Sequence, residues 1–518
     1  MKRLLFLQLV LTLLFWQCQT DNASQKESSS SESIIKKPET SIGGQLAMKY
    51  CSSCHLFPTP DLLDKVTWTE SVLPNMAARL GLRLNDYDPF EEIDLEEEVF
   101  LKKFNVYPEQ AVINESEWNE IQAFYQTMAP EKLEEVDHSN ALSNGPPPFQ
   151  AEILKIGDKP VPQVSLLEYN TTKRTLFIGD HQQLYALNQN SQVIGNWETQ
   201  SPSSDIEITN DGIMVLSIGE FKPSDKREGV LFPLTLTSDI SPEDLVITDL
   251  QRPVQFTVGD LNNDNQDDVV ICSFGNHQGQ LAWYDNFNKQ EAHILSSLPG
   301  ARKAIIQDLN GDGLKDIIAL MAQACEKLVV YYNQGDGQFK ETTLLELPSV
   351  YGVSYFELAD FNLDGHPDIL LTNGDNWDYS NIPKPYHGIR IYLNDGSNQF
   401  SLRYFYPLHG CNEARAIDFD KDGDLDIASI SFYNDNATEG FVYLQNDGQL
   451  NFTDHYMTEA AYGKWLTMDI GDFNNDGFQD IFLGSYFHNA AELSKLIAIG
   501  IDTFPEILLL TYSENKIQ

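Results

Sequence analysis

The pattern of apolar and polar residues changes character along the chain. Between residues 41 and 133 apolar positions recur at three-to-four spacing, as in SEWNEIQAFYQTMAP, and this spacing predicts helices, the last of them capped by Ser116. From residue 149 onward the apolar residues form short alternating or continuous runs between Gly-containing turns, which is typical of β-strands. The sequence therefore predicts a small all-α domain at 41–133, a linker at 134–148 that ends in three prolines, and an all-β domain at 149–518.

Five stretches of the β region repeat one arrangement of strands and turns. An alternating run leads into an acidic loop, and an apolar run leads out of it toward a third and a fourth strand. The first aspartates of the five loops are 48, 52, 58 and 54 residues apart. Four strands in a period of about 50 residues are typical of a propeller blade. Two strand-rich units near Leu167 and Asp205 lack the loop, so we predict a seven-bladed propeller, closed by strands near 149–156 and at LLLTYSEN.

Each acidic loop places oxygen-bearing residues at fixed positions. Counting the first aspartate as place one, side-chain oxygens recur at places three, five and nine, and glycine usually occupies place six, as Gly313 does. A hard cation such as Ca²⁺ takes about six to eight oxygens, which a tight turn supplies together with a backbone carbonyl at place seven. The candidate calcium ligands are Asp260, Asn262, Asp264, Asp268, Asp308, Asn310, Asp312, Leu314 (carbonyl), Asp316, Asp360, Asn362, Asp364, His366 (carbonyl), Asp368, Asp418, Asp420, Asp422, Asp424 (carbonyl), Asp426, Asp472, Asn474, Asp476, Phe478 (carbonyl) and Asp480.

Two other structures can contain an acidic loop of this kind. An EF-hand is excluded because place twelve, where it requires a glutamate, falls inside a strand at residues such as Ala319 and Leu371. An Asx-rich turn without a metal, whose carboxylates accept backbone amides, is the second alternative, and repulsion among the carboxylates argues against it for all five loops. The first loop has Asn265 in place of glycine and is expected to bind a cation most weakly.

The loops and their flanking strands resemble the FG-GAP or VCBS repeat, which is also found in integrin heads. The resemblance rests on stretches such as QDLNGDGLKDIIALM and GDFNNDGFQDIFLGS and covers about 350 residues. It implies a propeller fold and an extracellular binding role, and it does not name a ligand. Because the acidic loop recurs in every one of these five units, we expect calcium to be structural and to fix one turn per blade.

The first 18 residues predict export. They combine Lys2 and Arg3 with an apolar run too short to span a membrane, which is typical of a signal peptide. Cys18 resembles the lipidated cysteine of bacterial lipoproteins, although Gln17 stands where that family has a small residue, and a plain secretory signal is the alternative. The polar residues 19–40 are expected to form a tether. We therefore expect an exported protein, held by a lipid anchor to the outer membrane at its periplasmic face or at the cell surface.

Net charge and the absence of catalytic motifs limit which partners and reactions the sequence supports. Seventy-seven acidic against 34 basic residues give a net charge of −43, which argues against a nucleic-acid partner because two polyanions repel each other. The sequence lacks the GxSxG, HExxH and phosphate-loop motifs, which favours an electron-transfer and binding protein over a stand-alone enzyme. Cys272, Cys325 and Cys411 are expected to be buried thiols, with one disulfide among them as the alternative.

The segment YCSSCHLF at residues 50–57 offers two thiols and an imidazole. Zinc is disfavoured because no second ligand pair lies nearby, and a thioredoxin-type disulfide is disfavoured because no strand flanks the pair. CxxCH is an attachment motif for c-type haem, so we expect Cys51 and Cys54 to bond the haem vinyl groups and His55 to bind the iron.

Residues 41–133 resemble a small cytochrome c around this motif. A helix precedes CSSCH, and the terminal helix supplies Trp118, Phe124 and Tyr125 to pack against a porphyrin. The candidate for the second axial ligand is Met76, which Pro74 sets on a loop or at a helix start. Methionine ligation would favour electron transfer, whereas an open position would favour peroxide or small-ligand chemistry.

These features together predict a haem protein in which haem c carries single electrons and the propeller binds a protein, glycan or redox partner. Two alternatives stay open. One is a surface adhesion protein that binds a glycan or a protein, with the haem domain secondary. The other is a haem-linked dehydrogenase that acts on a sugar-like substrate, with His387, His409, Glu413 and Arg415 lining the pocket.

Overall fold

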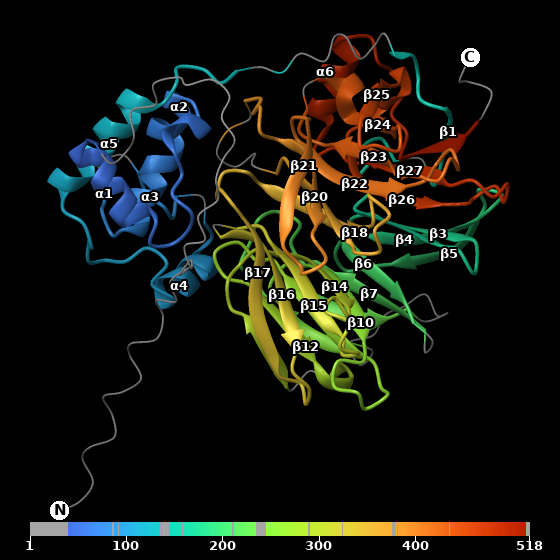
Figure 1. Ribbon diagram of the computed structural model, residues 1–518, viewed down its shortest axis with the longest axis horizontal. Helices are drawn as coiled ribbons and strands as arrows, with labels where there is room; N and C mark the ends of the chain where they lie inside the picture. Colours follow the sequence, from blue (N-terminus) through green and yellow to red (C-terminus); the bar gives the residue numbers. More distant parts are fainter. Residues whose placement is uncertain are drawn as a thin grey trace, which may run out of the picture.

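The structure is a computed structural model that describes residues 40–513 except 85–86, 92, 135, 137–143, 158, 210–211, 235–244, 289–290, 324, 376–379, 381 and 435. The signal segment, Cys18 and the tether lie outside the described residues. A helical unit lies beside a β-propeller (Figure 1). In the described part of the chain, no helix combines the length and the apolarity needed to cross a membrane.

The helical unit consists of helices joined by short turns, and α1 and α5 pack against each other. Its elements are α1 (Ile42–Cys51), the 3₁₀ turn η2 (Pro60–Leu62), α2 (Lys65–Thr67), the π-helical turn η3 (Trp68–Val72), α3 (Leu73–Arg79), α4 (Leu95–Lys103) and α5 (Glu115–Met128). Trp68, Trp118 and Tyr125 are fully buried in its core, and the rings of Trp68 and Tyr125 lie 4.4 Å apart. A Cβ on Gly43 would lie 2.2 Å from the carbonyl oxygen of Glu120, so α1 and α5 approach closely only because this position is glycine.

The N-cap expected for the terminal helix is wrong by two residues. Asn114, not Ser116, caps α5: its side chain accepts the amide of Glu117 at 2.9 Å, and the Glu117 carboxylate accepts the Asn114 amide in return. This reciprocal capping box satisfies two backbone amides at once. Ser116 already lies inside the first turn of α5, so it is not in the N-cap position.

The predicted seven blades are confirmed as seven four-stranded antiparallel sheets. Blades I to III comprise β2 (Leu166–Asn170), β3 (Thr175–Gly179), β4 (Gln183–Asn188) and β5 (Val193–Glu198); β6 (Ser203–Ile208), β7 (Ile213–Ser217), β8 (Gly229–Pro233) and β9 (Ile247–Leu250); and β10 (Pro253–Gly259), β11 (Asp268–Ser273), β12 (Gln280–Tyr284) and β13 (Ala292–Ser296). Blades IV and V comprise β14 (Ala301–Gln307), β15 (Asp316–Met321), β16 (Glu326–Asn333) and β17 (Phe339–Leu347); and β18 (Val353–Ala359), β19 (Asp368–Asn373), β20 (Gly388–Asn394) and β21 (Phe400–Pro407).

Blades VI and VII complete the ring. They comprise β22 (Cys411–Ile417), β23 (Asp426–Ser431), β24 (Phe441–Asn446) and β25 (Phe452–Tyr456); and β26 (Trp465–Gly471), β27 (Asp480–Ser485), β28 (Ile507–Tyr512) and β1 (Phe149–Leu154). Short helical segments are inserted at η6 (Asp285–Phe287), η7 (Ala437–Gly440), η8 (Thr458–Tyr462) and α6 (Ala490–Ala498). The second strand of every blade that carries an acidic loop is buried along its whole length, which explains its uninterrupted apolar sequence.

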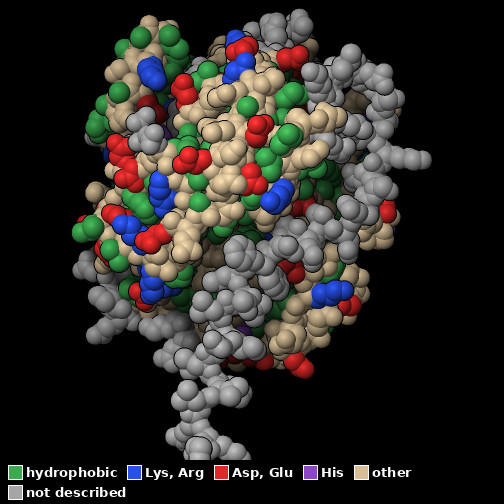
Figure 2. All heavy atoms as spheres, turned by 90° about the vertical axis from the view of Figure 1, so that its left-hand side faces the viewer, with side chains coloured by type: hydrophobic (Ala, Val, Ile, Leu, Met, Phe, Trp, Pro, Cys, Tyr) green, Lys and Arg blue, Asp and Glu red, His purple; other side chains and the backbone are tan. Residues whose placement is uncertain are grey.

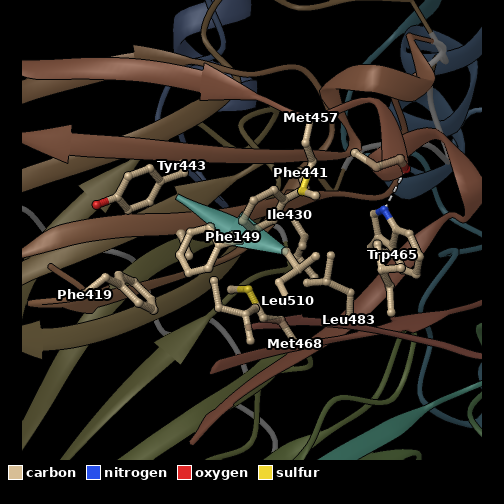
Figure 3. Packing of buried hydrophobic residues seen from close by; sticks show 14 of the residues in the cluster. Phe149, Phe419, Ile430, Phe441, Tyr443, Met457, Trp465, Met468, Leu483 and Leu510 are labelled. Carbon is tan, nitrogen blue, oxygen red and sulfur yellow. Dashed lines mark hydrogen bonds between the residues drawn. The ribbon is translucent and has the colours of Figure 1, made fainter. Parts of the chain in front are cut away.

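The ring is closed by the strand that follows the helical unit. β1 pairs antiparallel with β28, so that Phe149 lies opposite Tyr512, and the first and last strands of the propeller share one blade, as the sequence predicted. Figure 3 shows the ring of Phe149 among Phe419, Tyr443 and Phe441, and three of these aromatic pairs meet edge to face. This packing ties the two ends of the β region together.

Removing the Phe149 ring should therefore weaken the whole propeller. We expect Phe149→Ala to lower the free energy of unfolding by about 3–5 kcal/mol, because the side chain is fully buried and the cavity cannot collapse within closed β-sheets. Denaturant unfolding followed by fluorescence measures the change. Glu152→Ala, at an exposed position of the same strand, is the matched control and should change stability by less than about 0.5 kcal/mol. Equal effects of the two substitutions would contradict the closing role of β1.

The propeller has two faces with different loops. Because strands alternate in direction within an antiparallel blade, the loops from strand one to two and from three to four lie on one face, and the remaining loops lie on the other. The five acidic loops all join the first and second strands, so they share one face, the acidic-loop face. The loops from strand two to three, and from strand four to the next blade, form the docking face.

Candidate functional site

The CSSCH segment begins at the end of α1 and presents its two thiols differently. Cys51 is the last residue of α1 and is half-buried, whereas Cys54 is exposed. Burial raises the pKa of the Cys51 thiol to about 11. His55 is half-buried, and its Nδ1 lies 2.8 Å from the backbone oxygen of Leu56, so Nδ1 carries the proton and Nε2 keeps its lone pair. Burial also lowers the pKa of His55 and favours the neutral ring.

Cys51 and Met76 contact the same hydrophobic cluster. The buried part of this cluster includes Trp118, Phe124 and Tyr125, the three aromatic residues of α5 that the sequence singled out. Met76 lies in the first turn of α3, where Pro74 occupies one of the first two helical positions, as expected from the sequence. The indole Nε1 of Trp118 is a buried donor with no hydrogen-bond partner among the described residues. We refer to this group of residues as the helical-unit cluster.

The CSSCH segment contacts the docking face of the propeller. The thiol of Cys325, in the loop between β15 and β16, donates to the backbone oxygen of Cys54 at 2.8 Å. The sequence analysis predicts a buried thiol at Cys325, but the structure shows it half-buried. None of the described cysteines forms a disulfide. No local pattern in the sequence marks this contact, because its two residues are 271 positions apart.

Aromatic residues of the propeller complete the helical-unit cluster. Tyr351, after β17, and Tyr386, before β20, pack against the cluster, and their rings stack with centroids 4.7 Å apart and planes 10° apart. Val350 is buried within the same cluster. The hydroxyl oxygen of Tyr386 is a buried atom without a hydrogen-bond partner among the described residues. The helical unit and the propeller thus share one apolar core beside Cys51.

Hydrogen bonds join α4 of the helical unit to the docking face. Glu97 of α4 accepts the Ser224 hydroxyl at 2.9 Å and the Asp225 amide at 2.5 Å. Asp225 in turn faces His277 at 2.9 Å, and the far nitrogen of that ring lies 3.2 Å from the hydroxyl of Tyr107. Figure 2 shows this side of the molecule, where acidic side chains are interspersed with basic and apolar ones.

All five acidic loops fold the same way. The amide at place six donates to the carboxylate at place one in every loop, as Gly313 does to Asp308 at 2.9 Å, and the amide at place seven donates to the carboxylate at place five. Place six has a positive φ throughout, which glycine adopts without strain and Asn265 adopts at 63°. Place four is left-handed too, at Leu363 among others, and no residue type shared by the five loops marks this position.

The ninth-place aspartates are buried and bind the backbone. In four loops one carboxylate oxygen accepts the amide of a residue that ends or follows the third strand, as Asp316 accepts from Asn333 at 2.9 Å. The other oxygen accepts the place-two amide in four loops, and in the blade VI loop Asp426 accepts the Tyr443 hydroxyl instead, at 2.6 Å. Each ninth-place carboxylate therefore ties its loop to the blade. A cation would bind the lone pairs of that carboxylate that accept no hydrogen bond.

The blade VI loop gathers the most negative charge. Oxygens of Asp418, Asp420 and Asp422 lie within 4.8 Å of one another. Oδ1 of Asp418 and Oδ1 of Asp424 are buried atoms without a hydrogen-bond partner among the described residues. Desolvation, followed by repulsion from the other three carboxylates, raises the pKa of Asp424 to about 6. This loop is the arrangement that a bound cation would relieve most.

A second group of ionisable residues lies around the propeller axis, on the first strands of the blades, which follow one another around the centre. Its members, the axial cluster, are Glu168, Asp205, Glu207, Lys303, Tyr355, Glu357, Glu413, Arg415 and Asp469. Several of its carboxylates join neighbouring blades: Asp205 accepts the amide of Phe256 at 2.8 Å, and Glu413 accepts that of Met468 at 3.3 Å. A structural role, that of joining neighbouring blades, therefore explains why several of these carboxylates lie at the axis.

The axial cluster makes stability depend on pH. Burial, followed by repulsion from Asp469 and Asp205, raises the pKa of Glu168 to about 9. Because the folded pKa lies above the unfolded value, the stability that Glu168 contributes is complete below about pH 4 and is lost as the pH rises toward 9. We expect Glu168→Gln to be neutral at pH 5 and to stabilise the protein by about 1 kcal/mol or more at pH 9, measured by denaturant unfolding. Glu152→Gln should instead follow the wild-type pH profile.

The four residues considered for a sugar pocket form two pairs. His387 and His409 stack with ring centroids 5.1 Å apart and planes 4° apart. Arg415 donates from Nε to Glu413 at 2.9 Å within the axial cluster. Glu413 and Arg415 lie on β22, near the loop that precedes it, whereas the histidine pair lies at the docking face.

Comparison with known proteins supports the repeat assignment. Residues 260–319, 308–371 and 418–483 match the family model of the FG-GAP-like repeat, and these segments contain all five acidic loops. Among solved structures, the chain is similar to the Pan2 WD40 domain of Neurospora crassa, with 10% identity over 71% of this chain and 95% of that chain and a TM-score of 0.42. It is similar to the N-terminal domain of Nup159, with 12% identity over 70% and 95% of the two chains and a TM-score of 0.40.

A third similar structure is a lectin of Agrocybe aegerita that recognises non-reducing terminal N-acetylglucosamine, with 14% identity over 67% of this chain and 90% of that chain and a TM-score of 0.34. The propeller assignment for the present protein comes from its own strand pairing. The FG-GAP repeats indicate a propeller that binds a partner or a substrate.

Proposed function

We propose that this protein is an exported electron carrier in which haem c, attached at Cys51 and Cys54, lies where the helical unit meets a ligand-binding propeller. One observation carries the proposal: within CSSCH, Nδ1 of His55 donates to the backbone oxygen of Leu56, which leaves Nε2 unprotonated and able to bind a metal. A metal-binding histidine almost always makes such a bond with its other nitrogen. Met76 is the proposed second axial ligand, because it contacts the same cluster as Cys51.

The surrounding residues fit a porphyrin. The helical-unit cluster offers aromatic surface from α5, and the Nε1 donor of Trp118, which has no partner among the described residues, could donate to a porphyrin carboxylate. When bound, haem c would supply a site that accepts and releases one electron. The thiols and His55 hold it, while Tyr351 and Tyr386 exclude water on the propeller side.

The position of the CSSCH segment links the two halves of the proposal. Its backbone contacts Cys325 on the docking face, so a ligand or redox partner bound to that face would lie next to the electron carrier. Proximity matters because electron transfer needs no bond between donor and acceptor, only a short path between them. The acidic loops lie on the opposite face, where bound calcium would stiffen the blades without obstructing the partner. A lipid on Cys18 would keep the protein at the outer membrane.

The test is a visible spectrum of the full-length protein from a host that matures c-type cytochromes. We expect a c-type absorption band that changes when dithionite is added. Colourless protein whose Cys51 and Cys54 react freely with an alkylating agent would overturn the proposal and leave a calcium-loop propeller with a binding role.

A further inference from the structure

Four side chains meet at the docking face in blade V and its junction with blade VI. Lys384 and His387 come from the segment before β20, Arg390 from β20, and His409 from the turn between β21 and β22. The exposed fractions of Lys384, His387 and Arg390 are 2%, 1% and 5%. The two imidazole rings stack, and burial, followed by the charges of Lys384 and Arg390 among others, lowers the pKa of His387. These four residues form the basic cluster.

Both cations of the basic cluster are buried without a carboxylate partner among the described residues. Lys384 donates to the backbone oxygens of Ser380, at 2.8 Å, and Ile382, at 3.4 Å. Arg390 donates to the backbone oxygen of Tyr386 at 2.8 Å and to the side-chain oxygen of Asn373. Carbonyl oxygens satisfy the N–H groups, and the Arg390 guanidinium also lies over the rings of Phe405 and Tyr351, 4.2 and 5.1 Å from their centroids. None of the described carboxylates pairs with either charge, which is costly in a low-dielectric interior. Two such cations are unexpected in a protein with a net charge of −43.

The two imidazoles add unused hydrogen-bond donors. Nδ1 of His387 accepts the Gly410 amide at 3.4 Å, and Nδ1 of His409 accepts the Lys384 amide at 3.3 Å. An accepting Nδ1 means that Nε2 of each neutral ring carries the proton. Both Nε2 atoms are buried and have no hydrogen-bond partner among the described residues. Burial, together with the charge of Lys384, lowers the pKa of both rings, to about 4 for His409, so both are neutral near pH 7.

Nearby carboxylates do not complete this arrangement. The charge of Asp64, on the helical unit, acts on Lys384, and that of Glu439 acts on His409, but within the described residues neither pair is an ion pair. The Asp64 carboxylate is already occupied by the amides of Val66 and Thr67 at the start of α2. Water molecules could satisfy the two imidazole N–H groups, but they would not neutralise two buried positive charges. A metal ion is disfavoured because the neighbouring charges of Lys384 and Arg390 are positive and the contacts of both Nδ1 atoms favour a proton on Nε2.

We propose that the basic cluster binds a small oxyanion, either a carboxylate or a phosphate group of the ligand that the propeller takes up. The two Nε2–H groups would donate to its oxygens, and Lys384 and Arg390 would neutralise its charge. Tyr386, next to His387 in sequence, packs in the helical-unit cluster, so the anion would bind beside the proposed haem site. The inference rests on the proposed ligand-binding role of the propeller and does not depend on the haem.

Thermal melting of the full-length protein in three sodium salts tests the proposal. Acetate and phosphate are the probes, and chloride at matched ionic strength is the reference. We expect acetate or phosphate to raise Tm by about 2 °C or more above chloride, since a ligand that binds only the folded state stabilises it. A larger response to acetate would identify a carboxylate ligand, and a larger response to phosphate would identify a phosphate ligand. Equal Tm values in all three salts would overturn the proposal.

Two lysine variants separate the basic cluster from general charge effects. Lys384→Met should raise Tm in chloride, because it removes an uncompensated buried charge, and should abolish the response to the oxyanions. Lys327→Met removes a lysine that already pairs with Glu341 at 2.6 Å and should respond to the oxyanions as the wild type does. A Lys384→Met protein that keeps the wild-type response would refute the site.

Calorimetric titration of the wild type with the same salts provides a readout that needs no variant. Saturable heat with acetate or phosphate, absent with chloride, is expected; its absence would refute the site even if Lys384→Met failed to fold. Neither readout uses haem absorbance, so a negative result here leaves the haem proposal standing. Conversely, colourless protein leaves the oxyanion site standing.

Discussion

Replacing both thiols of CSSCH should abolish covalent haem. We expect wild-type protein from a host that matures c-type cytochromes to keep a haem stain in a denaturing gel, and the Cys51→Ala, Cys54→Ala double variant to show none. In the proposed attachment each thiol would bond one vinyl group, so without either sulfur nothing would hold the porphyrin once the fold is lost. His55→Ala separates attachment from ligation, because it leaves both sulfurs in place but removes the axial nitrogen. That variant should retain at least some stain and lose the native spectrum.

The matched control for the thiol experiment is Cys325→Ser. Its side chain donates to Cys54 from the propeller side, and serine can make the same hydrogen bond. We expect full haem content in this variant. Loss of the stain on replacing Cys325, or a stain that survives in the double variant, would show that attachment does not follow the CxxCH pattern.

The propeller could be predicted because its determinants are local and repeated. A blade needs alternating and apolar runs at a fixed period, and the acidic loops at Asp308 and its four counterparts mark that period in the sequence. Closure of the ring by β1 could also be predicted from the sequence, because the last blade lacked a fourth strand and an unassigned strand preceded the first blade. The acidic segment around α4 has no clear apolar period, since three consecutive glutamates interrupt it, and the structure shows a helix capped by Asp94.

The candidate sites were predictable only in their local parts. The Cys51, Cys54 and His55 motif and the spacing of the acidic loops are visible in short windows. Contacts such as Cys325 with Cys54, or the stack of Tyr351 on Tyr386, depend on how two units pack, and one sequence contains no periodic signal for that. The same holds for the basic cluster, whose lysine, arginine and two histidines resemble ordinary loop and strand residues until the fold brings them together.

The two faces of the propeller divide the proposed tasks. The helical unit, the CSSCH segment and the basic cluster all lie at the docking face, whereas the five acidic loops lie on the other. A ligand bound at the docking face would therefore contact neither the acidic loops nor calcium held there. This separation predicts that calcium affects stability and leaves electron transfer at the docking face unchanged as long as the protein stays folded.

Removing calcium should lower the stability of the propeller. We expect a chelator to lower Tm by about 5 °C or more, because each site that is saturated at one hundred times its Kd contributes about 2.7 kcal/mol and up to five loops can contribute. The physical reason is clearest in the blade VI loop, where Asp418, Asp420 and Asp422 crowd together and two buried carboxylate oxygens have no partner among the described residues. Without a cation their mutual repulsion favours the unfolded chain. Thermal melting with calcium, with chelator, and after calcium is restored measures the effect.

Neutralising part of the blade VI loop tests the cause of this stability change. The Asp420→Asn, Asp422→Asn variant keeps side chains of the same size that can still accept the backbone amides of the turn, so the Asx-turn geometry is retained. We expect this variant to be more stable than the wild type in chelator, since the repulsion is relieved, and less stable than the wild type in calcium, since two charged ligands are lost. In the Asx-turn alternative the backbone amides alone stabilise the loops, so the Tm of the wild type and of the variant should not depend on calcium. A wild-type Tm that does not change with chelator would favour that alternative and reject the calcium sites.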